Sequence, residues 1–206
     1  MFLTHAHMGH YAGLLQLGRE AYGAAGLAVF ASGPMQAFLE SNRPWSLMVE
    51  TGQIALLALE PDQPVPLTSG LRLTPLAVPH RHELTDTLAF LIEGPESALL
   101  YLPDIDKWER WDRRIEDLIA RVDVALVDGT FFADGEVPGR SLEDIPHPFI
   151  GESLARFAAL APAERAKIHF THLNHTNPAA DAESPAARAI RAAGMHVAAE
   201  GQLIDL

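Results

Sequence analysis

The stretch LTHAHMGH, residues 3–10, places three histidines within six positions almost at the start of the chain. His5 and His7 are two residues apart, so in an extended segment their side chains point to the same face and can bind one metal ion. His10 lies about one helical turn further along. A single histidine is more often a core or surface residue, but three together favour a metal site that recruits further ligands from elsewhere in the chain.

The composition predicts a folded, acidic protein. Hydrophobic residues make up 48% and charged residues 20% of the 206 residues, which is enough apolar material for a sizeable core. The formal net charge of -12 argues against a nucleic-acid partner, because such proteins need clustered Lys and Arg. Cysteine is absent, which excludes disulfides, a thiolate nucleophile and a Cys-based zinc site. Any metal therefore has to be bound by His and carboxylate groups.

Length and hydropathy set the expected organisation of the protein. The length suits a single domain over residues 1–206, and the sequence shows no internal repeat. No stretch approaches the roughly 20 apolar residues of a membrane span, and the N-terminus lacks the layout of a signal peptide. We therefore expect a cytoplasmic protein without a membrane partner that acts on a small molecule, and a homodimer is compatible with these features.

Apolar runs of strand length alternate with helical patterns along the chain. We expect a helix directly after the histidines, over residues 9–26. The other elements expected are strands over 27–32, 54–59, 71–78, 87–92, 98–102, 124–129, 167–172 and 195–206, and helices from Gly33 and over 106–122, 149–160 and 184–194. The strands between residues 54 and 102 are expected to be successive strands of one sheet, and Trp108 and Trp111 to pack in the core. This alternation predicts an α/β protein.

Several of the expected strands run directly into His or Asp. His80 follows the strand over 71–78, Asp104 follows the strand over 98–102, and His172 ends the strand over 167–172. Strand ends place such groups on loops held by a rigid sheet, where catalytic groups usually lie. Imidazole and carboxylate together suit zinc, manganese or iron, and zinc is the default expectation.

Four segments carry a family resemblance that covers the whole chain. LTHAHMGH, VPHRHELTDTLAFLI (78–92), LLYLPD (99–104) and FTHLNHTNP (170–178), in this order, resemble the metallo-β-lactamase superfamily. The resemblance is to the branch that contains PqqB proteins of coenzyme PQQ biosynthesis, cyclic phosphodiesterases and tRNase Z. It implies a metallo-β-lactamase-type αββα sandwich.

The resemblance also implies a set of metal ligands for one or two Zn2+ ions, with Mn2+ or Fe2+ as alternatives. A first ion would be bound by His5, His7 and His80, with Asp104 as a bridging ligand. A second ion would be bound by His10, Asp104 and His172.

The sequence departs from the superfamily pattern in two places. Gly9 stands where the signature has an Asp, so we expect the second metal site to be weaker. Only the segment MFLT precedes the signature, whereas the superfamily has a set of strands there. The resemblance therefore leads us to expect a chain that begins late and lacks the first N-terminal strands.

Other His and Asp residues near these motifs remain open candidates. His82 is a rival to His80, which comes first after the strand. Asp106 is expected to cap the helix that follows it. His147 lies in a region that resembles the superfamily's GH(S/T) segment, which implies a contact to an anionic group or a role as general acid. The alternative is a structural histidine in a Pro-rich turn. His175 could reach the substrate or cap its own loop.

These features predict a metal-dependent hydrolase. A metal-activated water, oriented by Asp104, would attack a phosphodiester or another ester or amide of a small molecule. One alternative is a PqqB-like biosynthetic enzyme whose metal, iron in that case, activates oxygen. The other alternative is a degenerate, non-catalytic member, motivated by Gly9 and by the missing N-terminal strands.

Overall fold

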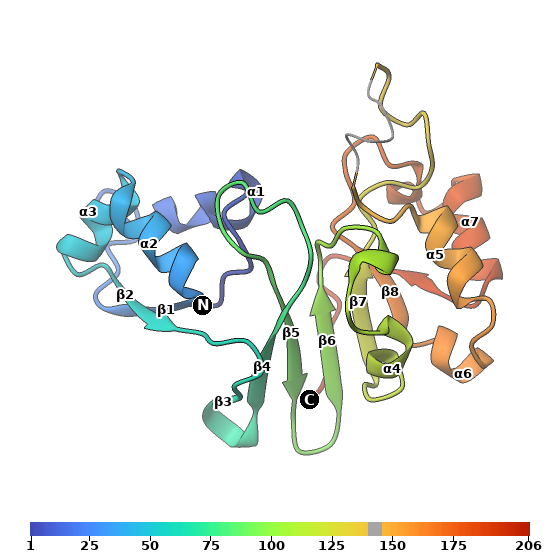
Figure 1. Cartoon of the computed structure of the whole chain (residues 1–206), viewed down its shortest axis with the longest axis horizontal. Coiled ribbons are helices and arrows are strands. Elements are labelled where there is room, and N and C mark those ends of the chain that lie inside the picture. Colours follow the sequence, from blue (N-terminus) through green and yellow to red (C-terminus); the bar gives the residue numbers. More distant parts are fainter. Residues whose placement is uncertain (140–145) are drawn as a thin grey trace.

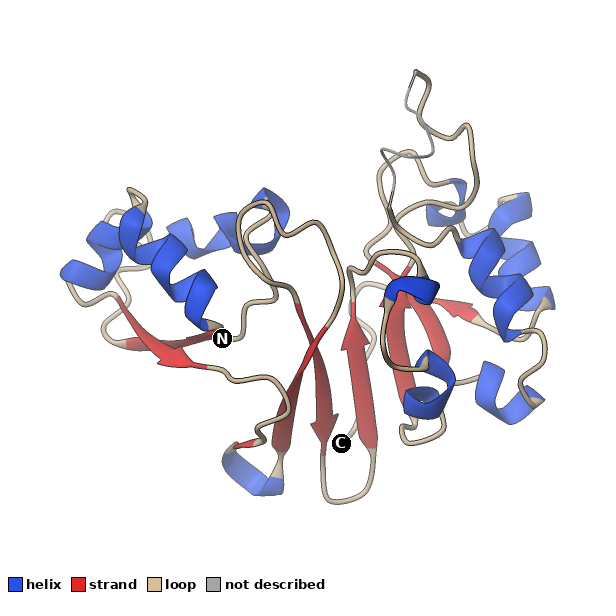
Figure 2. Cartoon of the chain, viewed as in Figure 1, coloured by secondary structure: helices blue, strands red, loops and turns tan. Residues whose placement is uncertain are grey.

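The computed structural model describes residues 1–139 and 146–206 and contains two β-sheets of unequal size (Figures 1 and 2). In the smaller sheet, β1 (Leu27–Ala31) and β2 (Ile54–Ala58) are parallel and are joined through α2 (Gly33–Ser41) and α3 (Trp45–Glu50). The Ser32 side chain accepts a hydrogen bond from Met35 N at the start of α2. At the other edge of β1, Phe2 pairs with Phe30 in a parallel bridge.

The larger sheet has seven strands in the order β3-β4-β5-β6-β7-β8-β9. They are β3 (Val65–Pro66), β4 (Arg72–Ala77), β5 (Leu88–Glu93), β6 (Ala98–Leu102), β7 (Val124–Asp128), β8 (Ile168–Thr171) and β9 (His196–Val197). The pairs from β3 to β6 are antiparallel, and those from β6 to β9 are parallel. Because β4 and β6 both pair antiparallel with β5, the strands β4, β6, β7 and β8 run in one direction, and their carboxyl ends meet at one edge.

Short helices connect and cover these strands. Besides α2 and α3 they are α1 (Met8–Tyr11), η1 (Ala12–Leu17), η2 (Thr68–Gly70), η3 (Trp108–Arg110), α4 (Ile115–Ile119), α5 (Ile150–Phe157), α6 (Pro162–Arg165), η5 (Pro178–Ala180) and α7 (Pro185–Ala192), where η denotes a 3-10 helix. None of the helices in the described part of the chain has the length and apolar character that a membrane span requires.

Three of the apolar clusters formed by the described residues lie between the layers. One packs α2, α3 and η1 against β1 and β2, and includes Met35, Leu39 and Val29. A second lies between the two sheets, where Phe2 and Phe30 pack with Leu88 and Phe90 of β5. The third packs α4, α5 and α7 against the outer face of the larger sheet. The layers are therefore helix, sheet, sheet, helix, which agrees with the predicted αββα sandwich.

Four expectations about individual elements were wrong. The strand expected over 195–206 is only β9, because the chain turns at Gly201, which has a positive φ of 78°. The strand over 54–59 belongs to the smaller sheet as β2, whereas the strands after it belong to the larger sheet. The helix expected over 9–26 is only α1 followed by η1, which ends at Leu17. The helix expected over 106–122 is broken into η3 and α4, because Trp111 is extended and its indole Nε1 donates to Ala77 O, 3.0 Å away. Both Trp108 and Trp111 pack in the core, as predicted.

Candidate metal centre

The carboxyl edge of the larger sheet brings together side chains that are far apart in the sequence. His80 follows β4, Asp104 follows β6 and His172 directly follows β8. The direction shared by these strands therefore places the three residues at one edge.

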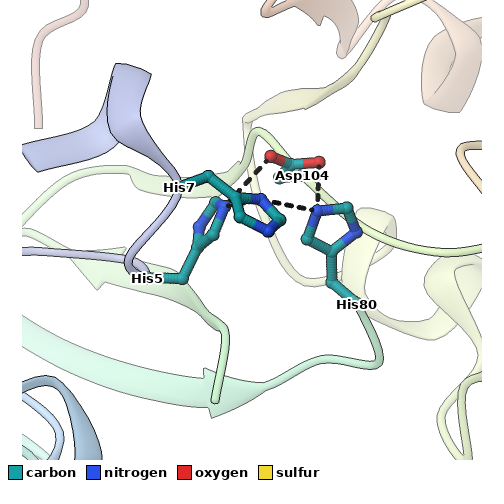
Figure 3. A group of neighbouring side chains, drawn as sticks. All are labelled: His5, His7, His80 and Asp104. Carbon is teal, nitrogen blue, oxygen red and sulfur yellow. Dashed lines mark hydrogen bonds and ion pairs between the residues drawn. The ribbon is translucent and has the colours of Figure 1, made fainter. Parts of the chain in front are cut away.

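The N-terminal histidine stretch is held against this edge by backbone contacts. Leu88 N donates to Thr4 O at 3.0 Å, and Ala6 N donates to the Thr85 hydroxyl at 3.0 Å. These two bonds fix the stretch beside the start of β5. His5, between them, is buried and points toward Asp104 (Figure 3).

The first group of converging side chains consists of His5, His7, His80 and Asp104 (Figure 3). His7 Nδ1 lies 2.9 Å from His5 Nε2 and 3.3 Å from His80 Nε2. Asp104 contributes both carboxylate oxygens, with Oδ2 at 3.3 Å from His5 Nε2 and Oδ1 at 3.2 Å from His80 Nε2. These are the four residues that the superfamily resemblance implied for the first ion.

The second group shares Asp104 with the first and adds His10 and His172. His10 Nε2 lies 3.2 Å from Asp104 Oδ2 and 3.0 Å from His172 Nε2. His172 Nε2 is 3.8 Å from the same carboxylate oxygen. The six residues proposed as ligands from the sequence thus lie together in two groups that share one carboxylate.

The chemistry of these groups fits a divalent cation. His7 Nδ1 lies 2.9 and 3.3 Å from the facing nitrogens of His5 and His80, close to the edge of about 3.3 Å of a tetrahedron with Zn–N bonds of about 2.0–2.1 Å. Asp104 Oδ1 is buried and has no hydrogen-bond partner among the described residues. A buried carboxylate oxygen facing several imidazoles needs a positive charge to offset its desolvation.

Burial and the carboxylate of Asp104 control the protonation of the cluster. Burial lowers the pKa of His80 to about 3, and it also lowers the pKa of His5 and of His172. Burial opposes the ionisation of Asp104, but hydrogen bonds from His10 and His5 outweigh it and hold the pKa of that carboxyl well below its usual range. Neutral imidazoles beside an ionised carboxylate are the protonation states in which these groups bind metal.

A third buried group adjoins the first. His147 Nδ1 lies 2.8 Å from Asp128 Oδ2 and 3.2 Å from Asp104 Oδ1. Burial favours neutral His147, but the charge of Asp128 and the hydrogen bond to it outweigh burial and raise the pKa of the imidazole. The structure thus brings His147, one of the residues left open by the sequence, into contact with the cluster.

His175 and His82 lie differently. Both are exposed, and His175 has no hydrogen bond or ion pair to the cluster among the described residues. His82 Nε2 faces the backbone N of His80 at 3.4 Å, whereas the ring of His80 is buried in the cluster. Of the two rivals, His80 is the one that the fold brings to Asp104.

Sequence reasoning missed the role of Asp106. Its carboxylate makes no cap to η3; it lies 3.2 Å from His80 Nδ1 and accepts a hydrogen bond from Arg110 at 3.0 Å. Glu83 was missed too, and its Oε1 lies 3.2 Å from His7 Nε2. The available signal was their place in the sequence, close to a proposed ligand on a loop at the same sheet edge.

Two backbone features shape the loops at this edge. His172 has a positive φ of 62°, a left-handed conformation that is uncommon for residues other than glycine and occurs at functional sites. Gly129 follows β7, and a Cβ there would lie 2.9 Å from Phe170 Cβ and 2.9 Å from Thr171 O. The end of β7 can therefore approach β8 closely only with glycine at this position.

Comparison with known proteins agrees with this fold. The family model described as "Beta-lactamase superfamily domain" matches residues 1–172. The chain belongs to this superfamily. Superfamily relatives include "Coenzyme PQQ synthesis protein B" of Nitrosococcus oceani, 31% identical over 155 residues that cover 66% of this chain and 49% of that protein. The protein of the same name from Methylorubrum extorquens (strain PA1) is 29% identical over 229 residues, 100% of this chain and 72% of that protein. The first match thus spans about half of the relative's length.

Solved structures of other proteins show the same fold. Zn(2+)-bound PqqB from Methylobacterium extorquens has a TM-score of 0.79 and 25% identity, covering 100% of this chain and 70% of that chain. The metallo-beta-lactamase fold protein YhfI from Bacillus subtilis has a TM-score of 0.66 at 19% identity, over 96% of this chain and 72% of that chain. A diphosphatase from the PhnP family has a TM-score of 0.59 at 16% identity, over 100% of this chain and 70% of that chain.

Proposed function

We propose that this superfamily member is a metal-dependent hydrolase that uses a metal-activated water on a phosphodiester, or on another ester or amide, of a small molecule. The observation that carries the proposal is the convergence of His5, His7 and His80 on Asp104. Zinc is the proposed metal, since the related PqqB structure is described as Zn(2+)-bound.

The chain's own residues have distinct roles in this proposal. His5, His7, His80 and Asp104 would hold the first ion, and His10 and His172 would hold a second ion with Asp104. A divalent ion held there would lower the pKa of a coordinated water to about 7 and would stabilise negative charge on the reacting oxygen. Asp104 has oxygens in both groups, so it can orient the attacking water between them.

His147 is proposed as the proton donor to the leaving group. It is buried, it lies 3.2 Å from Asp104 Oδ1, and its contact with Asp128 favours the protonated imidazole. His175 is proposed as a contact to the bound substrate, because it is exposed on the loop that begins at His172.

The test combines metal analysis with turnover of bis(p-nitrophenyl) phosphate. We expect purified protein to contain about one tightly bound divalent ion per chain and to hydrolyse this ester. His80→Ala should lose the ion and the activity, whereas His147→Gln should keep the ion and lower kcat about 10²-fold or more. His169→Gln, on β8, is the control variant for loss of one imidazole. The proposal would be ruled out if the wild-type protein bound no metal. It would also be ruled out if the His80→Ala variant kept full activity.

The likeness to PqqB favours a second candidate, a biosynthetic enzyme whose metal activates oxygen. Several relatives with the name "Coenzyme PQQ synthesis protein B" match this chain, and the Zn(2+)-bound PqqB structure gives a TM-score of 0.79. Oxygen consumption with an iron-loaded protein and a quinone precursor would favour this candidate. Ester hydrolysis that is independent of oxygen would favour the hydrolase.

A further inference from the structure

Each histidine of the two metal-facing groups has its second ring nitrogen against an oxygen atom of the protein. The kind of oxygen differs between the histidines. Two of them face a carboxylate directly, and the other three face a hydroxyl group. This difference bears on how strongly each imidazole binds a cation.

The two histidines that face carboxylates both belong to the first group. His7 presents Nδ1 to the other nitrogens, and its Nε2 lies 3.2 Å from Glu83 Oε1. His80 presents Nε2 to Asp104, and its Nδ1 lies 3.2 Å from Asp106 Oδ1. A carboxylate can only accept, so each ring keeps its hydrogen on the outer nitrogen and its lone pair on the inner nitrogen.

Hydroxyl groups hold the histidines of the second group. The Thr130 Oγ1 atom lies 2.9 Å from His172 Nδ1 and donates its own hydrogen to Asp128 Oδ1 at 2.7 Å. The Thr4 Oγ1 atom lies 3.4 Å from His10 Nδ1, and it also lies 3.1 Å from Nδ1 of His5. Because Thr130 donates its hydrogen to Asp128, it can only accept from His172, which fixes the tautomer of that ring. A neutral hydroxyl adds no full negative charge behind the ring.

We propose that Glu83 and Asp106 are positioning residues that give the first group a higher metal affinity than the second. A carboxylate behind a ligating imidazole orients the ring and makes its inner nitrogen a stronger electron donor. The inference rests on the proposed function, because it requires that this cluster binds a divalent ion. It goes beyond that function by assigning the order in which two ions bind.

The two carboxylates differ in how firmly they are held. Asp106 is buried, its carboxylate accepts from Arg110, and its backbone N donates to Pro79 O at 2.7 Å. The side chain of Glu83 is 52% exposed, and the nearest cation, Arg81, is 4.0 Å away. We therefore expect the larger loss of affinity when the charge of Asp106 is removed.

The experiment measures stepwise zinc affinity by competition with a chromophoric chelator, with the number of ions per chain determined in parallel. Asp106→Asn and Glu83→Gln keep the size of the side chain and an oxygen acceptor but remove the charge. We expect each substitution to lower the affinity for the first, tightly bound zinc ion (the tight step) about 10- to 100-fold. The affinity for the second, more weakly bound ion (the weaker step) should stay within about threefold of the wild-type value. Glu96→Gln, in the β5–β6 turn, is the matched control and should leave both steps unchanged.

A variant of the second group completes the design. Thr130→Val should lower the affinity of the weaker step only. Thr130→Ser keeps the hydroxyl, so its affinity in the weaker step should equal that of the wild type. If Asp106→Asn fails to fold by circular dichroism, Glu83→Gln on its exposed loop carries the test.

The outcomes separate the inference from the proposed function. If the wild-type protein binds zinc, and Glu83→Gln and any folded Asp106→Asn protein bind the first ion with unchanged affinity, the inference is overturned and the proposed function is not. Wild-type protein that binds no zinc would overturn both.

Discussion

At the scale of single residues, Gly9 has open space inside the histidine stretch. A Cβ at this position would have no atom within 4 Å, and Gly9 does not have a positive φ. Gly9→Asp should therefore be tolerated and should place a carboxylate beside His10. We expect the affinity for a second zinc ion to rise about 10-fold, measured by stepwise zinc titration.

The control for Gly9→Asp is Gly13→Asp, because a Cβ at Gly13 also meets no atom within 4 Å. This control adds the same charge outside the histidine stretch, in η1. Equal zinc affinities of Gly9→Asp and wild type would contradict the assignment of His10 to a metal site.

Gly129 gives a prediction about stability. A Cβ there would approach Phe170 Cβ and Thr171 O to 2.9 Å, so β7 and β8 would have to separate. We expect Gly129→Ala to lower the free energy of unfolding by about 1–3 kcal/mol in urea denaturation. Gly33→Ala, where the added Cβ meets nothing within 4 Å, should change it by less than about 1 kcal/mol. Similar losses in both variants would refute the close-approach argument.

The site residues that could be predicted are those marked by a pattern within a short stretch of the sequence. His5, His7 and His10 are close in the sequence, and His80, Asp104 and His172 each follow an apolar strand, so the sequence indicated all six. Asp106 also follows a strand, but its contact with His80 depends on the pairing of β4 and β6 through β5. A helix cap was therefore the simpler interpretation, and the structure shows that it was wrong.

At the scale of elements, an ion pair joins α4 to α5. Arg156 Nε donates to Glu116 Oε1 at 2.7 Å, and its Nη2 donates to Oε2 of the same carboxylate at 3.2 Å. Burial opposes the ionisation of Glu116, but the hydrogen bonds from Arg156 outweigh it and hold the pKa of this carboxyl below its usual value. Because the folded pKa is lowered, the pair stabilises the fold above the unfolded pKa, and this stability is lost as the pH falls through the folded pKa.

Arg156→Met should therefore lower the free energy of unfolding by about 1 kcal/mol at pH 7 and by less near pH 3. Urea denaturation at the two pH values measures the difference. Arg114→Met is the control, because Arg114 is exposed and its Nε is 3.8 Å from Glu116 Oε2. A loss that is the same at both pH values would show that the effect comes from packing and not from the ion pair.

Most strands could be predicted from their apolar runs, but the sheet to which each strand belongs could not. The runs at β2 and β4 are both of strand length and follow one another along the chain, yet they lie in different sheets. Strand partners depend on contacts between distant segments, such as Phe2 with Phe30. The amphipathic pattern over 106–122 was also compatible with one continuous helix, and only the bond from Trp111 to Ala77 shows why the segment extends there.

At the scale of the whole molecule, the two sheets share one apolar cluster, in which Phe2 and Phe30 pack on Phe90. We therefore expect residues 1–139 and 146–206 to unfold in one cooperative transition, as the single domain predicted from the sequence should. Calorimetry would show one peak with equal calorimetric and van't Hoff enthalpies. Two separate peaks would contradict the single domain. The homodimer stays a prediction, which light scattering of the purified protein can test.

Metal binding should couple to this global stability, because its ligands come from both ends of the chain. His5 and His172 meet at Asp104, so unfolding has to release the ion. At a free zinc concentration about 100-fold above Kd, we expect about 3 kcal/mol of added stability relative to protein in chelator. Thermal unfolding with and without a chelator measures this, and an unchanged Tm would contradict the coupling.

The most direct test of the whole account is an anomalous scattering measurement at the zinc edge on crystals grown with zinc. The account predicts a strong peak within about 2.0–2.3 Å of His5 Nε2, His7 Nδ1, His80 Nε2 and an Asp104 oxygen. It predicts a weaker peak, or none, between His10 and His172. A strong peak only elsewhere, or no peak at the first group, would contradict it.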